Sequence, residues 1–112
     1  MDCKICKILD ELDNYETLYE SMDYVVIVCP ITDLPVLIFK EHNKWIAGER
    51  AYKTTIEFGN LAEHRFGTKH LTINKRQGDY YNHVVWIACP IGDVLQDKFK
   101  EFPGLLEQWE ER

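Results

Sequence analysis

Two cysteines separated by two residues, Cys3 and Cys6, stand at the start of the chain and constrain its fold more than any other feature. The two-residue gap lets one tight turn aim both sulfur atoms at a single metal ion, and zinc prefers thiolate and imidazole ligands arranged in a tetrahedron. Such a site needs two further ligands from other parts of the chain. It would therefore tie the N-terminus to two distant segments.

Histidines are the natural candidates for the remaining ligands. His42 follows an expected strand and His83 begins another, whereas His70 opens a strand and His64 lies late in an expected helix. Spacing alone leaves any two of these four histidines open as ligands. Each of them could equally be a surface or hydrogen-bonded imidazole.

Composition and charge favour a single compact domain spanning residues 1–112, with 46% hydrophobic residues to form its core. The net charge of -6 argues against a nucleic-acid partner, which would need clustered Lys and Arg. The chain shows no secretory signal, and its longest apolar runs are too short to span a bilayer, so we expect a cytoplasmic protein with no membrane partner.

In the cytoplasm a CxxC pair favours metal binding or redox chemistry over a structural disulfide. A redox dithiol normally follows a strand at a helix start, and a chance pair of thiols is the third interpretation.

Runs of β-branched residues that stop at proline or glycine predict the secondary structure. We expect strands at 17–21, 24–29, 35–40, 69–74 and 82–89, a short helical piece within 3–13, and a polar loop at 75–81. One main helix should cover 46–65 and end near Gly67, and Asp93 could cap a C-terminal helix that starts at Val94. The short links predict an α+β domain, in which an antiparallel sheet of about five strands packs against these helices.

The order of the motifs resembles that of the histidine-triad (HIT) superfamily. Its members often begin with CxxC and a lysine, as in Cys3-Lys-Ile-Cys6-Lys7, and then carry a Pro-Lys-x-His segment. The stretch 36–42 is similar to that segment, with Phe39 where proline is usual. Thr72-Ile-Asn74, Gly78 and the stretch 82–90 resemble the later motifs in the same order. The resemblance covers about residues 3–90 and implies a HIT-like sheet.

The resemblance also implies a ligand set and an oligomeric state. In zinc-binding members the ligands are the two CxxC cysteines, the histidine after the lysine and the first histidine of the triad. Carried over, the ligands of a structural zinc are Cys3, Cys6, His42 and His83. Homodimers are common in the family, and Trp45, Ile46 and Trp109 could serve such an interface or equally the core.

The strand that carries the catalytic triad of the family departs from its pattern. The triad reads His-φ-His-φ-His on one face of a strand, and its middle histidine attacks the α-phosphorus of a nucleotide. Here these positions are His83, Val85 and Ile87, and valine has no nucleophilic atom. We therefore expect a non-catalytic, zinc-binding HIT-like domain with a ligand- or protein-binding role. Its cleft, which could take a small ligand such as a nucleotide, would be lined by Asn74, Val85, Ile87 and Cys89.

The alternative function is a nucleotide or phosphoester hydrolase or transferase that uses a different residue. Strict alternation along the last strand puts Cys89 on the same face as His83. Cys89, His64 or His70 would then have to act as base or nucleophile.

Overall fold

The computed structural model describes residues 3–78 and 83–91 of the chain. The elements are α1 (Lys4–Asp10), a 3₁₀ turn η1 (Leu12–Asn14), β1 (Thr17–Glu20), β2 (Tyr24–Val28), β3 (Pro35–Phe39), α2 (Gly48–Phe66), β4 (Leu71–Arg76) and β5 (Val85–Pro90). The predicted C-terminal helix and its cap Asp93 lie outside the described residues. None of the helices in the described ranges is both long and apolar enough to cross a bilayer.

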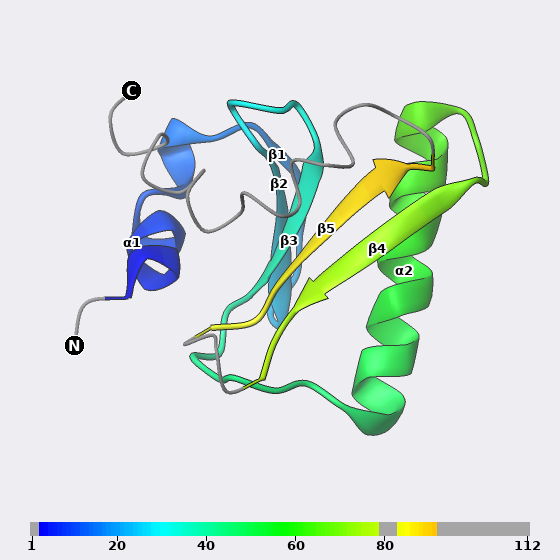
Figure 1. The fold of residues 1–112 in the computed structure, drawn as a ribbon. Coiled ribbons are helices and arrows are strands. Elements are labelled where there is room, and N and C mark those ends of the chain that lie inside the picture. Colours follow the sequence, from blue (N-terminus) through cyan, green and yellow to red (C-terminus); the bar gives the residue numbers. More distant parts are fainter. Residues whose placement is uncertain (1–2, 79–82, 92–112) are drawn as a thin grey trace.

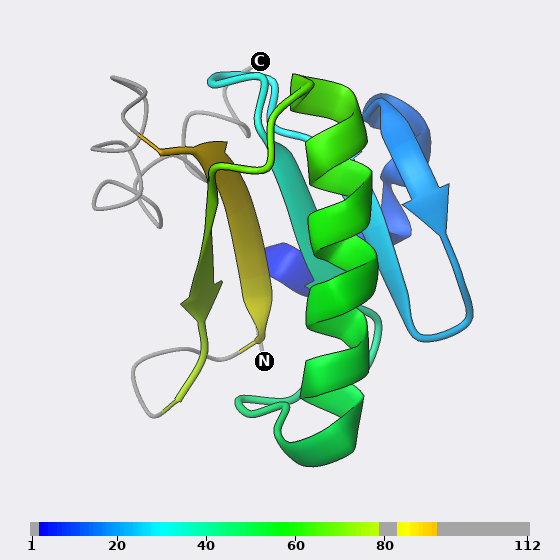
Figure 2. The same ribbon diagram turned by 90° about the vertical axis from the view of Figure 1, so that its right-hand side faces the viewer.

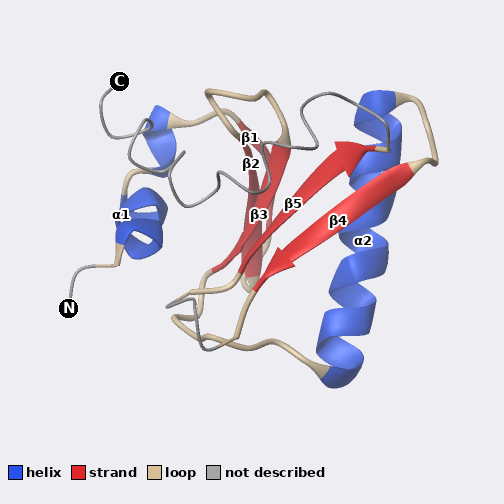
Figure 3. Cartoon of the chain, in the orientation of Figure 1, coloured by secondary structure: helices blue, strands red, loops and turns tan. Residues whose placement is uncertain are grey.

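The five strands form one antiparallel sheet in the order β1-β2-β3-β5-β4 (Figure 3). β2 and β3 pair as a hairpin along their full length, from Tyr24 opposite Phe39 to Val28 opposite Pro35. α2 and β4 separate β3 from β5 along the chain, yet β5 lies beside β3 in the interior of the sheet. The predicted α+β class and the antiparallel sheet are confirmed.

The two helices cover opposite faces of the sheet, so the domain has three layers (Figure 1). α1 packs Ile5 and Ile8 against alternate residues of the central strands, which form the first of two core clusters. α2 lies along the other face (Figure 2), where Phe58 and Ala62 join a second cluster that contains Trp86. Central strands with both faces covered need apolar side chains on both faces, which explains the unbroken apolar runs of β2 and β5.

The main helix agrees with the prediction to within two residues at each end. Phe58 and Ala62 are one turn apart and 1% and 0% exposed, so the buried stripe of α2 is narrow. Gly67 ends the helix with φ +70° and donates its N–H to the carbonyl of Glu63 at 2.8 Å. A glycine adopts this left-handed conformation without steric cost, so the predicted stop is confirmed.

The predicted loop at 75–81 begins two residues too early, because Lys75 and Arg76 belong to β4. They pair with Trp86 and Val85 of β5, and the Lys75 amine lies 4.4 Å from the centre of a Trp86 ring. This cation–π contact and the pairing with β5 extend the strand past the point where its composition turns polar. The last strand begins at Val85, later than the expected residue 82, because Val84 instead donates its N–H to Asn43 at 2.9 Å.

Candidate metal centre

The first two candidate ligands lie at the start of α1. Cys3 is the N-cap of this helix, and its Sγ accepts a hydrogen bond from the N–H of Cys6 at 3.3 Å. Both thiols are half-buried, and Ile5 and Ile8 anchor the helix to the sheet beneath them. The short helix thus holds both sulfur atoms on the side of the sheet where β3 ends and β5 begins.

The two imidazoles come from adjacent ends of neighbouring strands. His42 follows β3 and His83 precedes β5, and because these strands are antiparallel, the end of one meets the start of the other. The Val84 N–H bonded to the Asn43 carbonyl holds the two connecting segments together. The ring centroids of His42 and His83 are consequently 5.2 Å apart, although 41 residues separate them.

The four side chains converge on one point, with all ligand atoms within 4.8 Å of one another. The nitrogen-to-nitrogen distance, between the Nδ1 atoms of His42 and His83, is 3.3 Å. The sulfur-to-nitrogen distances are 3.2 Å from Cys6 to His42, 3.6 Å from Cys6 to His83 and 3.7 Å from Cys3 to His83. A tetrahedron built with ordinary zinc bond lengths has edges of about 3.3 Å for N···N and about 3.6 Å for S···N. Four of the six ligand-to-ligand distances therefore match the edges of a tetrahedral zinc site, and the other two are within 4.8 Å.

A hydrogen bond outside the cluster orients His83 toward the cluster centre. Its Nε2–H donates to the backbone carbonyl of Phe39, the last residue of β3. This bond fixes the tautomer in which Nδ1 keeps its lone pair, and Nδ1 is the atom that faces the other three ligands. His83 is 3% exposed, so the imidazole is held rigidly. A backbone carbonyl on the second nitrogen is the usual support of a metal-bound histidine.

The electrostatics of the site suit a cation. Burial raises the pKa of the Cys6 thiol to about 11, helped by the adjacent Cys3 and by the charge of Asp10. Burial also lowers the pKa of His83, and His42 adds to this effect while the bond to Phe39 opposes it. Without a cation the site therefore holds a protonated Cys6 and a neutral His83. A divalent metal would displace the thiol proton on binding, as thiolate ligation requires.

The other two histidines stay outside the cluster, as the resemblance implied. His64 lies in the last turn of α2 and His70 lies just before β4, and both are exposed. Neither could be excluded from spacing alone.

The predicted cleft residues lie on the sheet face that α1 covers. Val85, Ile87 and Cys89 belong to the first core cluster and are 2%, 3% and 0% exposed. Asn74 is half-buried on the neighbouring strand, directly opposite Ile87. The strict alternation predicted for Val85, Ile87 and Cys89 is therefore observed. The ligand cleft itself stays a prediction.

The predicted interface residues separate into two environments. Trp45 is 58% exposed, while Ile46 is 3% exposed and packs in the second core cluster. Trp109 lies outside the described residues. Ile46 thus serves the core.

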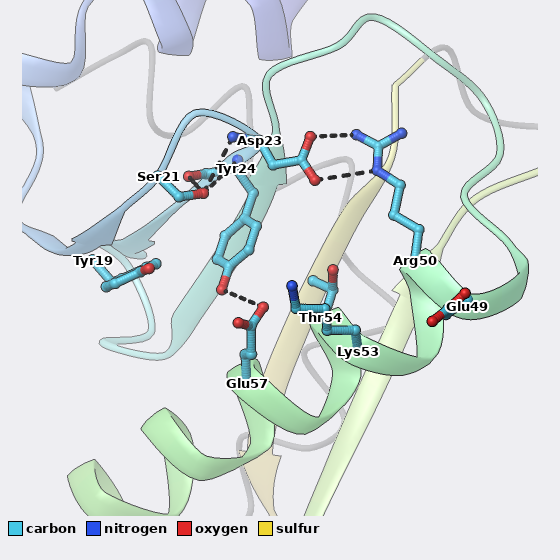
Figure 4. A pocket seen from close by; sticks show the side chains of 9 residues that line it. All are labelled: Tyr19, Ser21, Asp23, Tyr24, Glu49, Arg50, Lys53, Thr54 and Glu57. Atoms are coloured by element: carbon cyan, nitrogen blue, oxygen red, sulfur yellow. Dashed lines mark hydrogen bonds and ion pairs between the residues drawn. The ribbon is translucent and has the colours of Figure 1, made fainter.

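Sequence reasoning missed a pocket of mixed charge between the β1–β2 hairpin and the first half of α2 (Figure 4). The residues that line it come from two separate segments, 19–24 and 49–57, and neither segment contains a recognisable motif. The packing of α2 on the sheet brings these two segments together. No signal in the sequence marks this site.

A scan of the chain against protein-family models gives no match, and a search of curated proteins gives none either. The assignment of the site therefore depends on its geometry and on the residues themselves.

Proposed function

We propose that this chain is a zinc-stabilised binding domain related to the histidine-triad superfamily, without the covalent catalysis of that family. The observation that carries the proposal is the convergence of Cys3, Cys6, His42 and His83, in which four of the six ligand-to-ligand distances match the edges of a zinc tetrahedron. A site of two thiolates and two imidazoles favours zinc over the hard cations magnesium and calcium, which take oxygen ligands.

The zinc would be structural because the protein fills all four positions. A catalytic zinc site keeps one position open for water or substrate, whereas four side-chain ligands close the coordination sphere. The metal would then stabilise the folded domain, since it joins α1 to the segment that follows β3 and to the segment that precedes β5. The free energy of metal binding contributes directly to the stability of such a domain.

The proposed lack of catalysis follows from the strand after His83. Val85 and Ile87 occupy the positions of the other two histidines of a triad, and neither side chain can attack or hydrogen-bond a phosphate. Cys89 is the nucleophile nearest to them along this face, and it is fully buried. A buried thiol in apolar surroundings is inert. The domain would therefore act by binding a nucleotide-like ligand or a protein. It would form a homodimer.

Cobalt(II) substitution tests the metal site by spectroscopy. Cobalt bound by two thiolates in a tetrahedron gives intense visible bands and a thiolate-to-metal charge-transfer band, both of which octahedral cobalt lacks. We expect these bands in the wild type and in His64→Ala, the matched control, and their loss or a marked weakening in His42→Ala. Octahedral spectra in the wild type would overturn the proposal, and so would equal spectra in His42→Ala and His64→Ala.

A further inference from the structure

A pocket of about 450 Å³ lies on the α2 face of the sheet, the face opposite to Val85 and Ile87. Tyr19 and Tyr24 form its sheet wall, with their ring centroids 5.7 Å apart. Residues from the first half of α2 form the other wall (Figure 4). The volume falls within the range of small-molecule sites, roughly 300–1,000 Å³.

Two hydrogen-bond donors on the helix wall are unused. Thr54 is 3% exposed and lines the pocket, yet its hydroxyl makes no hydrogen bond among the described residues. Thr55, by contrast, donates its hydroxyl to the carbonyl of Ala51 at 2.7 Å. Lys53 lies beside Thr54 in Figure 4, and its amine forms no ion pair within the described part of the chain. The hydroxyl oxygen is not sealed from solvent, so it faces the open pocket and can meet a ligand there.

A hydrogen-bond acceptor, the carboxyl group of Glu57, stands at the other end of the same wall. The Tyr24 hydroxyl donates to Oε1 of Glu57 at 3.2 Å. Burial and the neighbouring Glu57 raise the pKa of Tyr24 far above its usual value, so the phenol stays protonated and is the donor of this hydrogen bond. The second oxygen of Glu57 is left for a cation, beside the two tyrosine rings that favour positive charge.

The remaining charges of the pocket are mostly engaged with each other. Arg50 binds Asp23 through two hydrogen bonds of 2.8 and 3.3 Å and binds Glu41 at 2.8 Å. Among the described residues this leaves Lys53 as the cation that can meet a ligand, and Glu49 and Glu57 as the carboxylates. A simple anion would meet Asp23, Glu49 and Glu57 in the same pocket, and a simple cation would meet Arg50 and Lys53.

We propose that this pocket binds a small zwitterion of the α-amino acid class, with its carboxylate on Lys53 and Thr54 and its ammonium on Glu57 against the tyrosine rings. A zwitterion satisfies both signs of charge, and its carboxylate can accept a hydrogen bond from the Thr54 hydroxyl that faces the pocket. The proposal is independent of the zinc site, since none of its residues belongs to the metal cluster.

The test compares three probes on the zinc-loaded full chain by NMR titration of backbone amides. The probes are L-phenylalanine, 3-phenylpropanoate, which lacks the ammonium, and 2-phenylethylamine, which lacks the carboxylate. The other L-amino acids of proteins are titrated as well, because the side-chain preference is open. We expect at least one L-amino acid to shift the amides of Lys53 and Thr54 and to bind about tenfold more tightly than its two truncated analogues, as expected for a lost hydrogen bond to a charged group. Absence of binding by every L-amino acid at millimolar concentration would overturn the proposal, and so would equal binding of the analogues.

Two variants assign the contacts. Thr54→Val keeps the shape of the side chain and Lys53→Gln keeps its length, and each should weaken the amino acid about tenfold. Lys69→Gln, an exposed lysine beyond the far end of α2, is the matched control and should bind like the wild type. Thr54→Val should be about as stable as the wild type, because the hydroxyl that it removes makes no hydrogen bond among the described residues. Unchanged affinity in both pocket variants would contradict the assigned site.

Discussion

Removing the metal should release α1 from the sheet while the sheet itself stays folded. Ordering the seven residues of α1 costs about 7–14 kcal/mol, at 1–2 kcal/mol per residue. Burial of Ile5 and Ile8, each 6% exposed, returns about 3–6 kcal/mol. The intrahelical hydrogen bonds of so short a helix add a few more, at about 1 kcal/mol each. These contributions nearly cancel, so the metal decides whether α1 is docked.

Hydrogen exchange followed by mass spectrometry measures this directly, on zinc-loaded protein before and after removal of the metal by a chelator. Amides of residues 4–11 should exchange much faster without metal, and those of β2, β3 and β5 should keep their protection, because the core cluster between these strands and α2 contains none of the ligands. Cys6→Ser should reproduce the chelated pattern, and His64→Ala the loaded one. Unchanged protection of α1 after the metal has left would refute the reasoning. Loss of protection throughout the sheet would refute it equally.

Three further predictions concern the buried groups of the domain. With the metal removed and α1 released from the sheet, Cys3 and Cys6 should react readily with iodoacetamide. Cys29 and Cys89, which are 2% and 0% exposed, should react only as fast as the domain unfolds. Fast alkylation of Cys89 in the folded protein, seen by peptide mapping, would support the enzyme hypothesis. Because the pKa of Tyr24 is raised in the folded state, the contribution of the protonated phenol to stability should be complete below about pH 10 and lost as the pH rises above that value. Tyr24→Phe should therefore flatten the alkaline fall in unfolding free energy measured by urea titration. An identical alkaline slope in the variant and the wild type would contradict this prediction. Trp86→Ala should cost about 3–5 kcal/mol in the same assay, since it removes a fully buried ring that packs on Phe39 at 5.2 Å and donates to Gln77, and a loss below 1 kcal/mol would contradict the packing described.

The parts of the fold that could be predicted are those where local chemistry and tertiary environment agree. β2 and β3 are apolar on both faces, and Pro30 and Pro35 bound the short link between them, so their strands and their hairpin follow from the sequence. Gly67 supplied a stop signal with a clear physical cause. The end of β4 could not be found in this way, because Lys75 and Arg76 are polar and only their pairing with β5 keeps them in the strand.

The metal cluster shows a different limit of sequence reasoning. The spacing of Cys3 and Cys6 predicts that they are ligands. The neighbouring sequence does not distinguish His83 from His70, because each histidine stands close to the start of a strand. The distinction depends on strand order: β5 lies beside β3, which places His83 next to His42, whereas β4 is an edge strand. The family resemblance selected His42 and His83 as ligands, which spacing alone could not do. The geometry of the cluster agrees with that selection. Neither a motif nor the family resemblance predicted the pocket around Thr54.

The most direct test of the account is the zinc content of freshly purified protein, measured by elemental analysis for the wild type, His42→Ala, His83→Ala and the control His64→Ala. We expect equimolar zinc in the wild type and in His64→Ala, and its loss, together with a lower unfolding temperature, in the other two. Wild-type protein that is folded, with reduced thiols and no zinc even after exposure to the metal, would contradict the account. The chain would then be an α+β domain with two free N-terminal thiols.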